Sequence, residues 1–273
     1  MTQSIENTGK IRPAAVAGLF YPDDPEELRQ TVNQLLNSTS YEGPQPRAIV
    51  APHAGYIYSG KTAACAYASL FPYRESIRRI VLLGPAHRVY IRGIAASSAD
   101  FFATPLGTIP VDQSALQSLA NMSQVVLSDE AHAQEHSLEV HLPFLQCLFK
   151  NFTLVPLVVG DTKPGQVAEV LEKFWDLQDT FVIISSDLSH YHDYASACLI
   201  DQATTEAIEH LELELIGSQQ ACGCRPLCGL LKIARDRNMH VKTLDLRNSG
   251  DTAGSRDRVV GYGAYALYNQ DPC

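Results

Sequence analysis

The sequence predicts a three-layer α/β/α sandwich, and two observations support this. Four short runs, "RAIVAP", "RRIVLLGP", "FTLVPLVVG" and "TFVIISSD", are apolar almost throughout, as is typical of strands covered on both faces. Helical segments separate or follow them, at 59–70, about 112–121, about 164–175 and 194–211. Alternation of buried strands with helices favours a sheet that carries helices on both faces.

An earlier helix is predicted in "YPDDPEELRQTVNQLLN". Asp24 is able to cap it, Pro25 suits the first helical position, and Glu27 completes a pattern similar to a capping box. Its apolar face consists of Leu28, Val32, Leu35 and Leu36. Further along, turn signals around Pro105-Leu106-Gly107 predict a hairpin beside the main sheet, and "VVGYGAYALY" predicts a final strand. No internal repeat or charged linker is visible, so we expect a single domain over residues 1–273.

Composition narrows the class of protein. The 273 residues are 45% hydrophobic and carry a net charge of −9, with no block of Lys or Arg, which argues against a nucleic-acid partner. The N-terminus lacks the basic and apolar regions of a signal peptide, and no apolar run approaches the roughly 20 residues of a membrane span. Seven scattered cysteines fit a reducing compartment better than a disulfide framework. We therefore expect a cytoplasmic globular protein that binds no membrane.

Polar side chains follow three of the predicted strands. "RAIVAPH" ends on His53, "RRIVLLGPAH" ends on His87, and "TFVIISSDLSHYH" supplies Asp187, His190 and His192. A single loop histidine more often only hydrogen-bonds a nearby carbonyl. Ligands of open α/β sheets, however, bind outside the carboxyl ends of the strands, where such loops converge. Three strand ends of the same kind therefore predict one shared site.

The stretch "DEAHAQEHSLEVHLPFLQ" leaves two interpretations open. His132 to His136 match the H-x-x-E-H pattern of one class of zinc peptidase, and on a helix both histidines would share a face. The pattern constrains only three positions, so we favour a polar loop at a helix entry. In that interpretation His136 and Glu139 point into the cleft.

The stretch "ACGCRPLCGLL" contains Cys222, Cys224 and Cys228 at a spacing unlike the paired C-x2-C of a structural zinc site. Pro226 is expected to start a helix, which leaves Cys222 and Cys224 in the loop before it. There the helix dipole would favour the thiolate, the nucleophilic and metal-binding form. Cys228 is expected to face the core. The cysteines read as small hydrophobic residues are Cys65, Cys147 and Cys198.

Seven motifs in order resemble the Memo-like family over nearly the whole chain: "FYP", "APHAGYIYSG", "LLGPAH", "EHSLEVHLPFLQ", "SSDLSHY", "CGCRPLCGLL" and "GDTAGSRDRVVGYGA". The resemblance implies a fold similar to the class III extradiol dioxygenases, which are non-haem iron enzymes that open catechol rings. It also implies, as partners, a radical-SAM protein and a third small protein, because bacterial and archaeal members are often grouped with them.

The resemblance further implies a set of site residues. The metal would be bound by His53, His87 and Cys222, and His136, Asp187 and His190 would line the same pocket as catalytic groups. The sequence departs from the pattern at "CGCRP", where Cys224 follows two residues after Cys222. Which of the two thiolates binds the metal therefore stays open, as does a Cys222/Cys224 redox pair.

Two imidazoles and one thiolate leave coordination positions for substrate or dioxygen. Oxygen-activating Fe(II) enzymes use a carboxylate as third ligand, whereas sulfur is softer, favours Cu(I) or Zn, and changes the potential of iron. We expect iron or copper, with zinc as the alternative. His190 is placed as an acid/base, and Asp187 either orients it or caps the following turn. The preferred hypothesis is a metal-dependent redox or oxygenase-like enzyme acting on a small molecule or a partner-protein residue. The alternatives are a non-catalytic adaptor that binds metal or a peptide in the cleft, and a zinc hydrolase using His132 and His136.

Overall fold

The computed structural model describes residues 9–270. The first eight residues, which bear on the signal-peptide prediction, and the last three, which include Cys273, lie outside the described residues. The strands are β1 Ile11–Arg12, β2 Ala48–Ala51, β3 Arg79–Pro85, β4 Ile94–Ala96, β5 Phe101–Thr104, β6 Gly107–Pro110, β7 Val125–Leu127, β8 Thr153–Val159, β9 Thr180–Ser185, β10 His190–His192, β11 His240–Asn248 and β12 Val259–Tyr268. The α-helices are α1 Pro25–Asn37, α2 Tyr56–Ala68, α3 Gln113–Ser118, α4 Asp129–Ala133, α5 Leu142–Leu148, α6 Pro164–Trp175, α7 Tyr194–Glu209 and α8 Cys224–Asp236. Short 3-10 turns lie at Phe71–Tyr73, Glu139–His141, Leu213–Leu215 and Ser249–Asp251.

A nine-stranded mixed sheet forms the middle of the molecule, in the order β10-β12-β2-β9-β3-β8-β4-β7, with β11 pairing β12. The four strands predicted from apolar runs are its neighbouring central strands β2, β9, β3 and β8, and they pair in parallel. Their side chains are buried except at the first residue of β3 and of β8. The apolar runs were therefore a correct signal for strands covered on both faces.

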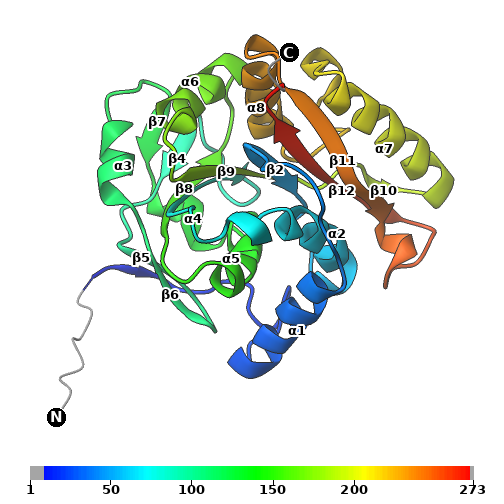
Figure 1. The fold of residues 1–273 in the computed structure, drawn as a ribbon, viewed down its shortest axis with the longest axis horizontal. Coiled ribbons are helices and arrows are strands. Elements are labelled where there is room, and N and C mark those ends of the chain that lie inside the picture. The colour runs from blue at the N-terminus through cyan, green and yellow to red at the C-terminus, as the bar shows by residue number, and fades with distance from the viewer. Residues whose placement is uncertain (1–8, 271–273) are drawn as a thin grey trace.

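Helices cover both faces of this sheet (Figure 1). The group α6, α7 and α8 lies on one face, where α8 packs on β3, β9 and α6. The group α1, α2 and α5 lies on the other, where α2 packs on β2, β11 and β12. The predicted three-layer arrangement is confirmed. Within residues 9–270, none of the helices combines the length and apolar content that crossing a bilayer demands.

Most predicted elements occur close to their expected bounds. Helix α1 begins at Pro25, and the Asp24 carboxylate accepts hydrogen bonds from the backbone N–H groups of Glu26 and Glu27. The predicted hairpin is β5–β6, which forms a separate small sheet with β1. The predicted final strand is β12. Helix α2 begins at Tyr56, three residues before the predicted start at 59.

Two features of the C-terminal third differ from the prediction. Strand β11 was missed, because "HVKTLDLRN" mixes charged and apolar residues and lies half exposed against β12 alone. Helix α8 begins at Cys224, not at Pro226, because a proline is tolerated anywhere in the first turn, where its missing N–H has no intrahelical partner. Cys224 is therefore a helical residue, and only Cys222 stays in the preceding loop.

Candidate metal centre

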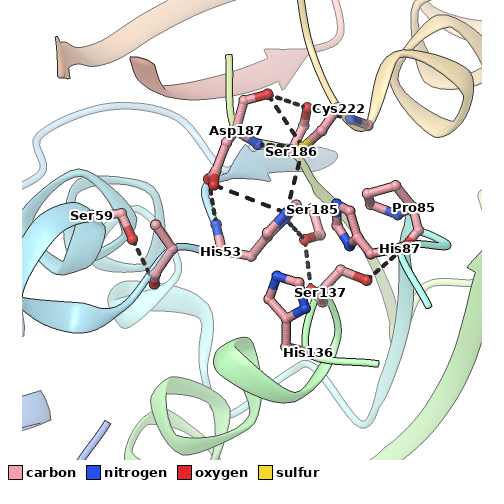
Figure 2. Close-up of polar contacts among 12 residues, drawn as sticks. His53, Ser59, Pro85, His87, His136, Ser137, Ser185, Ser186, Asp187 and Cys222 are labelled. Carbon is pink, nitrogen blue, oxygen red and sulfur yellow. Dashed lines mark hydrogen bonds and ion pairs between the residues drawn. The ribbon is translucent and has the colours of Figure 1, made fainter. Parts of the chain in front are cut away.

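Three histidines from separate parts of the chain meet at the carboxyl ends of the parallel strands (Figure 2). His53 follows β2, His87 follows β3, and His136 comes from the loop after α4. One ring nitrogen from each lies within 4.8 Å of the others. The ring centroids are 5.2 Å apart for His53 and His87, 5.4 Å for His53 and His136, and 4.7 Å for His87 and His136. Parallel pairing of β2, β9 and β3 creates this convergence, because it brings the strand ends to one edge.

The proton on His53 is placed by a short hydrogen-bond chain. The Ser185 hydroxyl, at the end of β9, donates to the carbonyl of Ser137 at 2.6 Å. Its oxygen therefore accepts from His53 Nδ1, which lies 2.6 Å away. With the proton on Nδ1, the Nε2 lone pair of His53 is free to bind a metal. This buried serine sets the tautomer of the ring.

Glu135 does the same for His87. Its carboxylate accepts hydrogen bonds from His87 Nδ1 at 2.9 Å, from the His87 backbone N–H at 2.6 Å and from the Ser137 backbone N–H at 2.9 Å. Burial raises the pKa of Glu135, but the hydrogen bonds and charge of His87 outweigh it and lower the pKa to about 2. An ionised carboxylate only accepts, so His87 Nδ1 carries a proton and binds this partner, which leaves Nε2 as the ring nitrogen for a metal. Glu135 was not predicted as a site residue, although a carboxylate directly before His136 was the available signal.

The third ring is His136. Its Nδ1 is buried and has no hydrogen-bond partner within the described structure, lying 3.3 Å from a Glu135 oxygen. Burial lowers the pKa of His136 to about 4, and burial, followed by the neighbouring histidines, lowers the pKa of His53 well below its usual value. Both rings are therefore neutral near pH 7, which is the form that binds metal ions.

Cys222 lies beside this cluster. Its Sγ is 3.4 Å from His53 Nε2 and accepts a hydrogen bond from the Asp187 backbone N–H at 3.3 Å. It is not among the three residues whose donor atoms are mutually within 4.8 Å. Burial and the Asp187 charge raise the pKa of the Cys222 thiol, and burial raises that of Cys224. The prediction that the helix dipole favours both thiolates is wrong, because loss of solvent dominates. Both cysteines are free thiols in the structure.

Asp187 and His190 lie next to the cluster in different ways. Asp187 is buried, and its Oδ1 accepts from the His53 backbone N–H at 2.7 Å, so it fixes the turn that carries His53. Burial raises the pKa of Asp187 to about 6, against the opposing charge of His190. His190 lies in β10, where its Nδ1 donates to the carbonyl of Leu188 at 2.8 Å. That carbonyl, and not Asp187, forms the hydrogen bond that orients the His190 ring.

Two residues singled out in the sequence lie away from the cluster. The fully buried Glu139 pairs with Arg12 and accepts from the backbone N–H groups of Ala15 and Val16, at 2.8 and 3.0 Å, so it does not point into the cleft as predicted. His132 bonds the carbonyl of Ala95 at 3.0 Å, and α4 ends at Ala133. His132 and His136 therefore do not share a helix face, and the structure does not support the zinc-peptidase pattern.

The remaining cysteines divide by exposure. Cys228 is buried in the core, as predicted. Cys65 and Cys147 are partly buried, whereas Cys198 is exposed on α7, so the expectation of a small hydrophobic residue is wrong for Cys198.

Two hollows flank the cluster. A groove of about 700 Å³ is lined by Leu19, Phe20, Ile57 and Tyr58, and the Phe20 ring stands 4.8 Å from His136 between the groove and the histidines. A cavity of about 180 Å³ on another side is lined in part by Cys222. The His87 side chain is 29% exposed while that of His53 is 2% exposed, so the cluster opens to solvent beside His87.

Comparison with known proteins identifies the family of this chain. The family described as "Memo-like protein" matches residues 12–266. MEMO1 family proteins of Thermoplasma volcanium and Aquifex aeolicus are 32% and 35% identical to this chain, over 95% and 93% of it and 99% and 97% of their own lengths. A crystal structure of an uncharacterized Escherichia coli K12 protein aligns with 93% of this chain and 99% of its own at a TM-score of 0.44 and 12% identity. The family match and the full-length relatives together show that this chain belongs to the Memo-like protein family.

Proposed function

We propose that this protein is a metal-dependent enzyme of redox or oxygenase-like type, with its metal bound by His53, His87 and His136. The observation that carries the proposal is the arrangement of hydrogen bonds behind the rings. Ser185 and Glu135 each accept from a protonated Nδ1, which leaves the Nε2 atoms of His53 and His87 as the ring nitrogens for a metal. Metal-binding histidines typically have their second nitrogen held in this way.

The donor set fits a metal ion that keeps open coordination positions. Three imidazoles suit iron, copper or zinc, and here one ring nitrogen from each lies within 4.8 Å of the others. Cys222, with Sγ 3.4 Å from His53 Nε2, is in reach as a further or alternative ligand. Sulfur at this position favours Cu(I) or Zn, and imidazoles suit iron as well, so we propose iron or copper, with zinc as the alternative.

A bound iron or copper ion would supply one-electron or oxygen chemistry at this position. The chain contributes the proton handling. His190 Nδ1 donates to a carbonyl, so Nε2 is the ring nitrogen that would exchange a proton with a substrate. Asp187 holds the His53 backbone, and Phe20 keeps the apolar groove separate from the rings. Substrate reaches the cluster on the exposed His87 side.

Metal content tests the proposal. Protein purified without oxygen and analysed for its elements should contain close to one equivalent of iron or copper, and the variant H53A/H87A should contain almost none. The matched control is His210→Ala, an exposed histidine at the end of α7, which should keep the wild-type content. Normal metal content in the H53A/H87A variant would end the proposal.

Single variants identify the third ligand. His136→Ala should remove most of the metal if the three histidines bind it, whereas Cys222→Ser should leave the content largely unchanged and alter the absorption spectrum. The reverse pattern would assign the third position to Cys222, as the family resemblance implies.

The non-catalytic adaptor is the second candidate, and the exposed apolar side chains of Leu19 and Ile57 in the large groove favour it. Partner binding distinguishes the two. If the protein is an adaptor, the wild-type protein and H53A/H87A should bind the partner with the same affinity, and neither should show turnover.

A further inference from the structure

A polar groove of about 480 Å³ lies beside the small cavity that reaches Cys222. Its basic side chains are Arg92, Lys163 and Arg225, and its acidic side chain is Asp161. Asp161 and Arg225 also line the small cavity, so the two hollows adjoin. A ligand in the groove would therefore extend toward the sulfur of Cys222.

The charge of this groove is opposite to that of the whole protein. The chain carries a net charge of −9, yet three cations here face one carboxylate. Arg225 is paired, donating to Asp161 at 2.5 Å and to the Thr162 carbonyl at 3.2 Å. Arg92 and Lys163 form no ion pair with the residues in the range 9–270. Two uncompensated cations in one hollow attract an anion.

The backbone next to Arg92 and Asp161 is closely packed at Gly93, which lines the groove, and at Gly160, which lines the small cavity. Gly93 adopts a positive φ of 103°, and a Cβ there would lie 2.3 Å from the Gln124 carbonyl oxygen. A Cβ on Gly160 would lie 2.1 Å from the Ile91 carbonyl oxygen. Backbone hydrogen bonds join these segments. The Gly160 N–H donates to the Gly93 carbonyl at 2.9 Å, and the Gly93 N–H donates to the Asp161 carbonyl at 2.8 Å. The cations thus project from a fixed base and not from a loose loop.

We propose that this groove binds the anionic group, phosphate or carboxylate, of a small organic molecule whose remaining part extends toward Cys222 and His87. The planar fork of an arginine suits either group, and a hollow of this size suits a small molecule. The small volume of the adjoining cavity, about 180 Å³, favours a small molecule over the surface of an acidic protein. That this molecule is the substrate rests on the proposed function, whereas the anion site itself does not.

Calorimetric titration of chelator-treated protein tests the anion site without any metal. Phenyl phosphate and benzoate are the two anionic probes, and phenol is their neutral counterpart. At least one anionic probe should bind while phenol does not, and R92Q/K163Q should weaken that binding about tenfold or more, as expected for charge-assisted hydrogen bonds. The probe that binds identifies the preferred group.

Lys61→Gln is the matched control, because Lys61 lines the apolar groove on the other side of the cluster. It should leave the affinity unchanged. Binding of neither anion, equal binding of phenol, or equal losses in K61Q and R92Q/K163Q would each overturn the anion site.

A second measurement tests whether the groove leads to Cys222 and the histidine cluster. Methyl methanethiosulfonate modifies free thiols, and mass spectrometry follows each cysteine separately. The bound anion should slow modification of Cys222 severalfold and leave the exposed Cys198 unaffected. Equal modification of Cys222 with and without the anion would show that the groove does not lead to the cluster, even if the protein binds metal as proposed.

Discussion

The tautomers of His53 and His87 are determined by two neighbours that no histidine pattern reveals. Ser185 is the last residue of β9 and Glu135 lies in the loop after α4, and both are buried. Each places a proton on Nδ1 and so leaves Nε2 for a ligand. The candidate ligands could be found from the sequence, because they follow apolar runs. Of their hydrogen-bond partners, Glu135 had a signal in its place directly before His136, whereas Ser185 had none, because many hydroxyls lie at similar sequence positions.

Glu135→Gln tests whether Glu135 sets the orientation of the His87 ring. An amide offers one acceptor oxygen and turns an NH₂ group toward the N–H donors of His87, so the ring loses its orientation. Metal affinity, measured by competition with a chelator, should fall about 10- to 100-fold, as is usual for such partners. The control Glu130→Gln changes an exposed carboxylate of α4 and should have no effect. An unchanged affinity in E135Q would contradict the assigned role.

His132 predicts a pH dependence that is independent of the cluster. Burial lowers its pKa to about 4, below the value of about 6.5 in the unfolded chain. The unfolded state therefore binds more protons between these values, so the contribution to stability is complete above pH 6.5 and is lost as the pH falls toward 4. The free energy of unfolding in urea falls between pH 7 and pH 4.5, and it should fall by about 2–3 kcal/mol less in His132→Gln than in wild type. Parallel pH curves for both proteins would show that the prediction is wrong.

At the level of elements, the segment from Arg12 to Tyr21 is held over the site by one buried carboxylate. Glu139 forms an ion pair with Arg12 and accepts hydrogen bonds from two backbone N–H groups and from the Tyr21 hydroxyl. The Phe20 carbonyl accepts a hydrogen bond from the Tyr56 N–H at 2.8 Å. The segment thereby places Phe20 against His136. Glu139 was expected in the cleft because helical spacing from His136 suggested it, but the turn from Glu139 to His141 directs it to the N-terminal segment.

Glu139→Gln should release this segment. It leaves the buried Arg12 guanidinium without its counter-charge, which costs about 3–5 kcal/mol in comparable buried pairs. The free energy of unfolding in urea should fall by that amount, and a protease should cleave within residues 12–21 faster than in wild type. The control Glu26→Gln alters an exposed first-turn residue of α1 and should change neither. If E139Q unfolds with the same free energy as wild type, Glu139 does not hold this segment in place.

The elements that could be predicted are those whose signal is local. The central strands are apolar throughout, α1 has its Asp24 cap, and β12 is a continuous apolar run. Strand β11 was missed because its pairing with β12 comes from tertiary contact, and its charged residues interrupt the apolar pattern that marks a strand. The start of α8 was placed too late because proline marks a first turn without specifying the position in it.

For the whole molecule, the parallel order β2-β9-β3-β8 explains why residues 53, 87 and 187 meet. The three-layer fold could be predicted, since alternating strands and helices specify it. The position of His136 could not, because it lies on a loop whose path depends on the bonds of Glu135 and Ser137 to β3 and its extension. The same order places an apolar groove and a basic groove on different sides of the cluster.

Anomalous diffraction from crystals of the protein, recorded at the absorption edges of iron, copper and zinc, tests the central claim most directly. The account predicts one strong peak that appears on crossing the edge of one of these metals, about 2.0–2.2 Å from Nε2 of His53 and of His87 and within bonding distance of His136. The peak would identify the metal and its ligands together. A peak elsewhere in the molecule, or no peak at the cluster in protein that holds stoichiometric metal, would contradict the account.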